Sequence, residues 1–129
     1  MYDDILQAVI DMATLTNPYS PILTGSMPPD NGIAMTGQGG VIATDLNIGT
    51  LQRMSIVING KNSDQHTVIK ALDTIHRFLT IRKDFPGNAD WQIYAIETVS
   101  SPRLLGREQN DQWIYGSSIS VKFKMKGLK

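Results

Sequence analysis

The sequence predicts one α+β domain over residues 1–129, in which an antiparallel or mixed β-sheet of about four to five strands carries two packed helices. Three observations predict this class. The chain has 129 residues, the size of one ordinary domain, and 41% of them are hydrophobic, which is enough to bury a core. Apolar residues repeat with a helical period in two segments and with a period of two in others. The resulting order is helix, loop, strands, helix, strand, strand, without an internal repeat.

An amphipathic helix is expected over residues 2–15. Ile5, Val9 and Met12 follow the i, i+4, i+7 spacing of one helical face. Two aspartates stand in the first turn, where the helix dipole favours acidic side chains. The Asn-Pro pair at 17–18 ends the helix, because the residue before proline avoids helical backbone angles.

A long loop is predicted over residues 18–40, with at most one short strand at 33–36. The loop contains four prolines and five glycines among polar residues. Because loops of this length in compact domains are usually functional or disordered, it is a candidate for partner binding. The remaining residues, 41–127, are expected to form the sheet-and-helix core. The candidate interface residues of the loop are Met27, Pro28, Asp30 and Asn31.

Two extended segments follow, at residues 41–49 and 52–59. In the second, Met54, Ile56 and Ile58 alternate with other residues, a period of two that predicts a strand. The Asn-Gly pair at its end favours a turn.

The best-patterned element is a helix after this turn. Asn62, Ser63 or Asp64 can cap its first turn. It is expected to end near residues 85–88, where Pro and Gly occur together. Its apolar seam consists of Val68, Leu72, Ile75 and Leu79.

Two strands complete the sequence. Residues 91–99 are apolar on both faces, which predicts a central strand, and the Ser-Pro pair at 101–102 breaks it. Residues 103–112 then form a polar connection. Residues 113–126 alternate between apolar residues and Ser or Lys, which predicts a last strand with one buried and one solvated face.

The composition excludes several classes of protein. Without cysteine there is no disulfide framework, zinc finger or thiol nucleophile. Twelve Lys and Arg balance twelve Asp and Glu, which argues against general DNA coating. No apolar run is long enough to span a bilayer and the N-terminus is acidic, so we expect a soluble protein without a membrane partner.

The charge is divided along the chain. Residues 1–52 contain five aspartates and no Lys or Arg, a net charge of −5. Residues 53–129 contain all twelve basic residues and seven acidic ones, a net charge of +5. If the fold separates these charges, copies can meet head to tail as a ring or filament. Alternatively, the two parts interleave and neutralise each other within one copy.

Residues for catalysis or metal binding are not grouped in the sequence. His66 and His76 are ten residues apart on one expected helix, about 15 Å along its axis, and cannot share a metal. His76 is interpreted as a hydrogen-bonded residue at the edge of the core. The glycine-rich residues 37–40 lack the lysine of a phosphate-binding loop, and no G-x-S-x-G motif is present. We therefore expect no catalytic residue, cofactor, metal or enzyme activity.

An apolar pair lies in the predicted polar connection. Leu104 and Leu105 stand between Arg103 and Arg107. Large apolar residues in a polar turn are candidates for a contact with another subunit, although one of them can instead close the end of the core.

Three lysines share one face of the last strand: Lys122, Lys124 and Lys126. They can contact DNA or an acidic partner surface. The competing interpretation is that they keep an exposed strand from aggregating.

The segments RMSIVINGKNSDQHTVIKALDTIHRFL (53–79) and IYAIETVSSPRLLGREQNDQWIYGSSISVKFKMKG (93–127) carry a recurring arrangement. It consists of a strand, a polar turn, a helix with a long apolar seam, a strand ending in Ser-Pro, a Leu-Leu-Gly-Arg connection and a final strand led by Trp. In this arrangement the chain resembles the tail-terminator and minor capsid, or head–tail joining, proteins of tailed bacteriophages.

The resemblance implies a structural virion protein assembled in the host cytoplasm. Its subunits would form a ring, hexameric in members of the family, at the head–tail junction. The implied partners are further copies of the chain, the tail-tube protein, the head-connector or head-closure protein, and genome DNA that passes through the lumen without sequence-specific binding. A minor capsid or head-closure protein is an alternative, and a small nucleic-acid-binding module is an alternative of another class.

Overall fold

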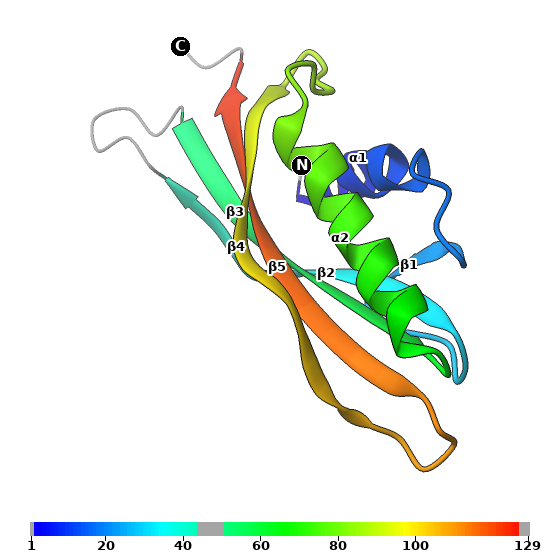
Figure 1. The fold of residues 1–129 in the computed structure, drawn as a ribbon. Helices are drawn as coiled ribbons and strands as arrows, with labels where there is room; N and C mark the ends of the chain where they lie inside the picture. Colours follow the sequence, from blue (N-terminus) through cyan, green and yellow to red (C-terminus); the bar gives the residue numbers. More distant parts are fainter. Residues whose placement is uncertain (1, 44–50, 127–129) are drawn as a thin grey trace.

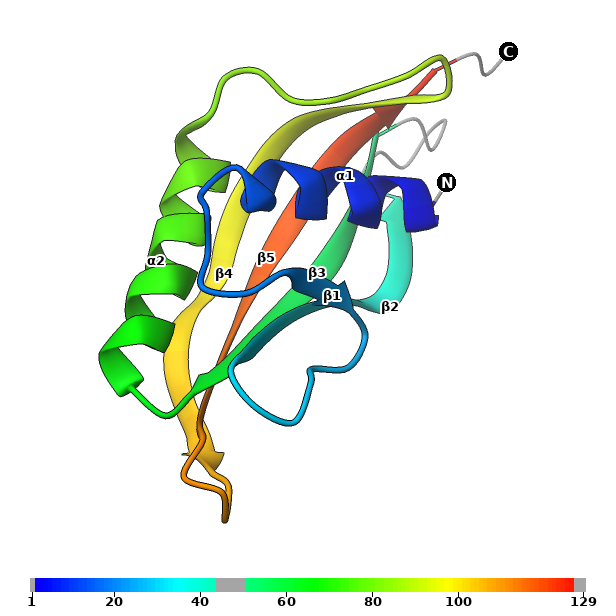
Figure 2. The same ribbon diagram turned by 90° about the vertical axis from the view of Figure 1, so that its right-hand side faces the viewer.

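The computed structural model describes residues 2–43 and 51–126, and it confirms the α+β class. A five-stranded mixed sheet forms one layer, and two helices form a second layer on one side of it (Figure 1 and Figure 2). Along the chain the elements are α1 (Tyr2–Thr14), β1 (Ile22–Thr24), β2 (Gly32–Ala43), β3 (Leu51–Asn62), α2 (Gln65–Ile81), β4 (Trp91–Arg107) and β5 (Trp113–Met125).

The strand order places β4 at an edge. The order is β1-β2-β3-β5-β4, with β1 parallel to β2 and all other neighbours antiparallel. The prediction of a central strand at 91–99 was therefore wrong. Apolar residues occur on both faces of this strand, but Tyr94 and Val99 are 44% and 65% exposed. The residue pattern of a strand shows which of its side chains are apolar. It does not show whether one or two other strands pair with it.

The predicted loop at 18–40 is largely structured. Residues 22–24 form β1, and β2 starts at Gly32 and continues to Ala43, far beyond the short strand expected at 33–36. Glycine and alanine residues give β2 a weak strand propensity, but it pairs with β3 from Gln52 to Lys61, and this tertiary pairing overrides propensity. Of the extended segment expected at 41–49, residues 41–43 end β2, and the others lie outside the described residues.

The Asn-Gly pair at 59–60 is not a turn. β3 continues to Asn62, and Gly60 pairs with Tyr115 of β5. A Cβ on Gly60 would lie 3.2 Å from the Tyr19 hydroxyl oxygen and 3.2 Å from Cγ1 of Val68. The glycine therefore allows a close approach between the sheet, α2 and the segment after α1.

α2 confirms the predicted seam and one of the three predicted caps. Asp64 has extended backbone angles, and its side chain accepts a hydrogen bond from the backbone N–H of His66 at 3.2 Å. The helix ends at Ile81, about one turn before the predicted end. Arg82 is already extended, and its guanidinium lies 4.7 Å from the ring centre of Phe78. This contact and the extended backbone direct the chain toward β4.

The Ser-Pro pair at 101–102 does not end β4, which continues to Arg107. Several register shifts against β5 accommodate the proline, because an edge strand can lose a backbone N–H on its outer side. The polar connection is consequently limited to residues 108–112. β5 alternates as predicted, except that Ser120, assigned to the solvated face, is only 6% exposed between Ser55 and Glu97 of its neighbours.

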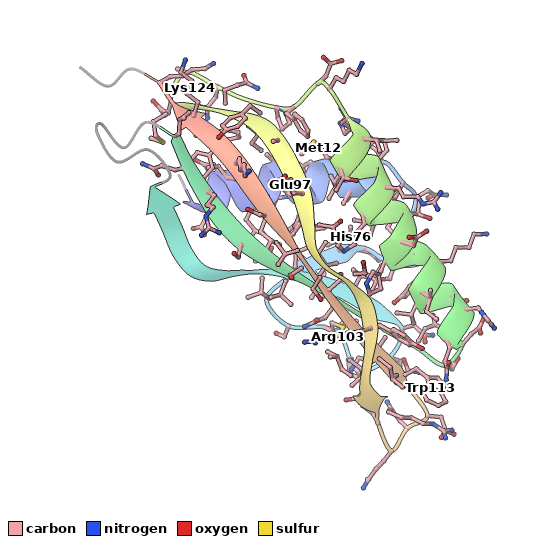
Figure 3. The ribbon with its side chains drawn as sticks, turned by 60° about the vertical axis from the view of Figure 1, so that its left-hand side comes forward. Met12, His76, Glu97, Arg103, Trp113 and Lys124 are labelled. Atoms are coloured by element: carbon pink, nitrogen blue, oxygen red, sulfur yellow. The ribbon has the colours of Figure 1, made fainter. Side chains whose placement is uncertain are left out.

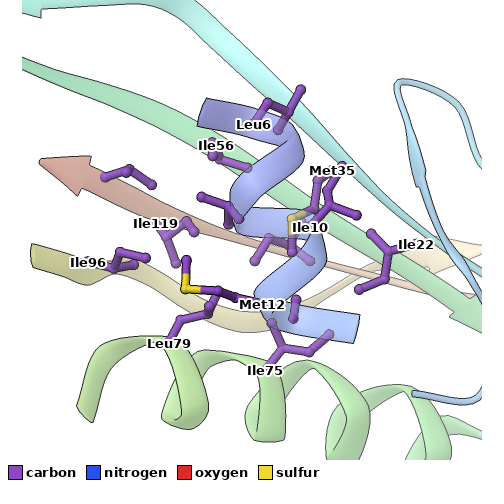
Figure 4. Close-up of a cluster of buried hydrophobic side chains, with 14 of the residues drawn as sticks. Leu6, Ile10, Met12, Ile22, Met35, Ile56, Ile75, Leu79, Ile96 and Ile119 are labelled. Carbon is purple, nitrogen blue, oxygen red and sulfur yellow. The ribbon is translucent and has the colours of Figure 1, made fainter. Parts of the chain in front are cut away.

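The core lies between the helices and the sheet (Figure 4). α1 crosses over the strands, as predicted for an amphipathic helix, and α2 lies beside β4 (Figure 2). Met12 of α1 and Leu79 of α2 meet the strand residues Ile96 and Ile119 in this layer. The other side of the sheet carries no helix (Figure 1). Neither described helix is long and apolar enough to cross a membrane.

Candidate functional site

The two histidines occupy different environments on α2. His66 is exposed near the N-terminus of the helix, whereas His76 is 5% exposed and shares a 2.8 Å hydrogen bond with the Thr98 hydroxyl. Burial lowers the pKa of His76, and the nearby Asp73 carboxylate partly opposes this shift. His76 is therefore a hydrogen-bonded core residue, as interpreted. Within residues 2–43 and 51–126, no three His, Cys, Asp or Glu residues are placed to hold a metal ion.

The helix-free side of the sheet is the larger candidate surface, and we call it the open face. Alternation along the paired strands sets its membership, because residues opposite each other in an antiparallel pair point to the same side. Arg103 lies on this side, whereas Met12, His76 and Trp113 lie on the side of α2 (Figure 3). The open face comprises Arg53, Ser55, Val57 and Asn59 of β3, Gly116, Ser118, Ser120, Lys122 and Lys124 of β5, and Glu97 and Arg103 of β4.

The open face carries an excess of positive charge. Lys122 forms an ion pair with Glu97, with 2.6 Å between Nζ and Oε1, and this hydrogen bond and charge raise the pKa of Lys122. No carboxylate of the described residues lies within ion-pair distance of Arg53, Arg103 or Lys124. Within the described ranges, three cations without an ion-pair partner therefore flank one neutral pair.

The predicted lysine ladder is only partly available for a partner. Lys122 is paired, and Lys126 lies beyond the end of β5, where its Nζ donates to the Asn88 carbonyl at 3.0 Å. Lys124 is exposed. Sequence reasoning missed Arg53, which the register places opposite Lys122. The signal was present, since Arg53 precedes the buried Met54 and continues the series of positions, with Ser55 and Val57, that alternates with the buried residues of the strand.

A shallow hollow of about 210 Å³ lies on the open face next to Arg103. Leu105 covers Gly116 here: a Cβ on that glycine would be 2.7 Å from Leu105 Cδ1 and 2.9 Å from Asn59 Oδ1. The Asn59 oxygen is buried, and no hydrogen-bond partner for it occurs in the described part of the chain. The hollow thus combines an exposed leucine, a cation and an unused acceptor.

The predicted interface residues of β4 are divided between two sides of the sheet. Arg103 and Leu105 line the hollow on the open face. Leu104 is opposite the inward-facing Tyr115 and points to the helix side. The side chain of Arg107 has partners in its own chain. Its Nη2 lies 2.8 Å from Asp111 Oδ1, and its guanidinium is 4.8 Å from the Trp113 ring centre.

The predicted loop residues contact the turn between β4 and β5. The backbone N–H of Asn31 donates to Gln112 Oε1 at 2.8 Å, and Asn110 Nδ2 donates to Asp30 Oδ1 at 2.8 Å. Met27 and Pro28, which precede these residues in the sequence, are half-buried. The loop residues therefore contact the turn that follows the second predicted interface segment, and part of their polar groups is used within the protein.

The acidic part of the chain is concentrated on α1. Asp3, Asp4 and Asp11 are exposed, and α1 contains no Lys or Arg. Gln7 Nε2 donates to Asp11 Oδ1 at 2.8 Å along the same helix face. The charge division therefore persists in three dimensions, with α1 and the open face on opposite sides of the sheet. It is incomplete, because pairs such as Lys61 with Glu108 neutralise locally.

Comparisons with known proteins detect the fold and not the sequence. No family model matches the chain, and no curated protein matches it. Solved structures do match, including a chain described as "Virion of native gene transfer agent (GTA) particle". That chain matches with a TM-score of 0.63 at 11% identity, over 92% of this chain and 92% of that chain. At this identity the likeness shows a shared fold.

Proposed function

We propose that the chain is a structural protein of a bacteriophage-like virion. The observation that carries this proposal is the fold shared with a chain of a gene transfer agent virion over 92% of both chains. The surfaces are consistent with a binding role, since the chain presents an exposed acidic helix and an open basic sheet face. A protein that acts by binding needs no catalytic group, and we do not propose an enzymatic activity.

Within this class we propose a tail terminator or head–tail joining subunit. Copies would form a ring, with six subunits as in the family it resembles, between the tail tube and the head connector. Genome DNA would pass through the lumen. The edges of the sheet support assembly through other surfaces, because β1 has three residues and β4 has repeated register shifts, and both features discourage edge-to-edge pairing. A minor capsid or head-closure protein remains the alternative.

The experiment is to add the purified chain to polymerising tail-tube protein of the same phage-like particle and to follow tube length by electron microscopy. We expect tubes that stop growing and carry a ring at one end. Arg103→Glu should weaken binding of the chain to the tube end. Lys83→Glu makes the same charge change in the loop after α2 and should not weaken it. Unchanged tube length with a chain that stays monomeric would contradict the terminator role, and binding to the connector alone would favour head closure.

Nucleic-acid binding has weaker support. Lys122 and Lys126 have partners within the protein, which leaves Lys124 as the member of the predicted set without an ion-pair partner among the described residues. DNA binding that falls steeply with salt, and that is lost when all three lysines are changed to glutamate, would favour this alternative.

A further inference from the structure

We propose that α1 of one copy lies along the open face of the next copy, in a head-to-tail contact that repeats around the assembly. The partner is a second copy of this chain. The proposal names the contacting surfaces of the self-assembly proposed above, and it rests on that function. Heterologous contacts of this kind close into rings when the rotation between copies permits it.

The first surface is one face of α1. Asp3, Asp4 and Asp11 fall within about 100° of the helix circumference, given 100° per residue. All three are exposed, and α1 itself contains no basic residue. Leu15, directly after the helix, is 69% exposed at the end of this face. The surface is an acidic stripe with an apolar end.

The second surface is the open face. Arg53, Lys124 and Arg103 have no carboxylate within ion-pair distance among the described residues, and these three cations give the open face its positive charge. The sheet separates this face from α1 (Figure 1), and the stripe of one copy cannot lie on the open face of the same copy. Opposite charges on opposite sides favour stacking of one copy on another.

The shape of the open face suits a helix. Its centre consists of small side chains in neighbouring positions of β3 and β5, with Ser55 opposite Ser120 and Val57 opposite Ser118. Long cationic side chains lie around this centre. A helix backbone can approach closely over small residues, while the surrounding cations reach the aspartates at its sides.

The dimensions of the two surfaces match, and the exposed leucine at one end of each surface gives the direction of the helix. Asp3 and Leu15 are separated by about 18 Å along a helix axis. Arg53 and Asn59 are separated by about 20 Å along β3, and Asn59 lies in the same row as Arg103, with Gly116 of β5 between them. With Leu15 placed against Leu105, which is 52% exposed, the end of α1 that carries Asp3 lies at Arg53 and Lys124.

The first test uses charge reversal followed by mixing, with self-association measured by sedimentation velocity. Asp3→Lys/Asp11→Lys makes both surfaces positive, and Arg53→Glu/Lys124→Glu makes both negative. We expect each variant to self-associate about tenfold more weakly than wild type, since two attractive pairs become repulsive. Mixing the two variants should restore assembly, because each negative surface then meets a positive one.

Two controls change the net charge equally at other exposed positions. Asp84→Lys/Asp90→Lys matches the first variant, and Lys70→Glu/Lys83→Glu matches the second. Both should assemble as wild type does. Weakening by the controls to the same extent would show that net charge, and not the proposed surfaces, governs assembly.

The second test uses the absence of native cysteine. Leu15→Cys/Leu105→Cys should give a disulfide-linked ladder of copies under mild oxidation. Leu15→Cys/Leu104→Cys is the matched control, because Leu104 is 50% exposed but points to the helix side. Equal ladders from both variants, or a ladder from the control alone, would overturn the proposed direction.

The outcomes separate this contact from the function on which it rests. A wild-type ring that none of the reversals weakens would overturn the contact while leaving the virion role intact. A wild-type chain that neither self-associates nor binds tube protein would overturn both. If Arg53→Glu/Lys124→Glu abolishes retention on DNA and leaves self-association unchanged, the open face is a nucleic-acid surface and the contact is wrong.

Discussion

Replacing Gly60 with alanine is expected to destabilise the protein, because the new methyl group meets two side chains with no room to move. Its Cβ would lie 3.2 Å from the Tyr19 hydroxyl oxygen and from Val68 Cγ1. The carbonyl oxygens of Gly32 and Lys61 hold this hydroxyl at 2.8 and 2.9 Å, and Val68 is fully buried. Overpacking of this kind costs about 1–3 kcal/mol. Alanine recovers about 0.4–1 kcal/mol by restricting the unfolded chain.

The expected net result is a loss of about 1 kcal/mol in the free energy of unfolding, measured by urea denaturation. Gly106→Ala is the matched control in β4, since a Cβ there has no heavy atom within 4 Å. It should be neutral or slightly stabilising. If Gly60→Ala is as stable as Gly106→Ala, the close approach does not explain the glycine and the reasoning is refuted.

Three further predictions concern buried groups. Burial raises the pKa of Tyr19 from 10.0 to about 12, against the opposing hydrogen bond to Lys61. The unfolded chain therefore loses the phenol proton first, so stability should decline as the pH rises from 10 through 12, and Tyr19→Phe should reduce this decline in denaturation curves. Burial lowers the pKa of His76, so its midpoint in an NMR titration should lie below 6.5. The unfolded chain then binds this proton first, so the stability that the neutral ring contributes is present above pH 6.5 and should fall as the solution is acidified below that value. A His76 ring that titrates normally would contradict its buried placement. Leu72→Ala in the seam of α2 should cost about 2–5 kcal/mol, against less than about 0.5 for the exposed Ile81→Ala, and equal costs would show that the seam is not the core.

The elements with a strong local pattern were predicted correctly. The seam of α2 and the alternation of β5 each repeat over several turns or residue pairs, and these patterns are visible without any partner. β2 was predicted only in part, as a short strand at 33–36 and an extended segment from 41, because its glycines have weak strand propensity, and only pairing with β3 explains its length. The Asn-Gly pair at 59–60 was misassigned because the same dipeptide suits a turn and a close backbone approach.

The candidate surfaces were predicted in part. The Arg103 to Arg107 segment was identified as a contact region, but its side chains point to both sides of the sheet, which the expected polar connection could not show. Arg53 was missed because its importance depends on Lys122 and Lys124 in a strand far away in sequence. A surface made by several strands has no local signature in any one of them.

The sequence by itself determined the fold class, the faces of α2 and β5 that are buried, and the division of charge between the two parts of the chain. These properties depend on residue type and on spacing over a few neighbours. The tertiary structure alone decided that β4 lies at an edge, that Lys122 is neutralised by Glu97, and that the acidic helix and the basic face lie on opposite sides of the sheet. The physical reason is that strand order and cross-strand register join residues that are distant along the chain, and local periodicity carries no information about such pairs.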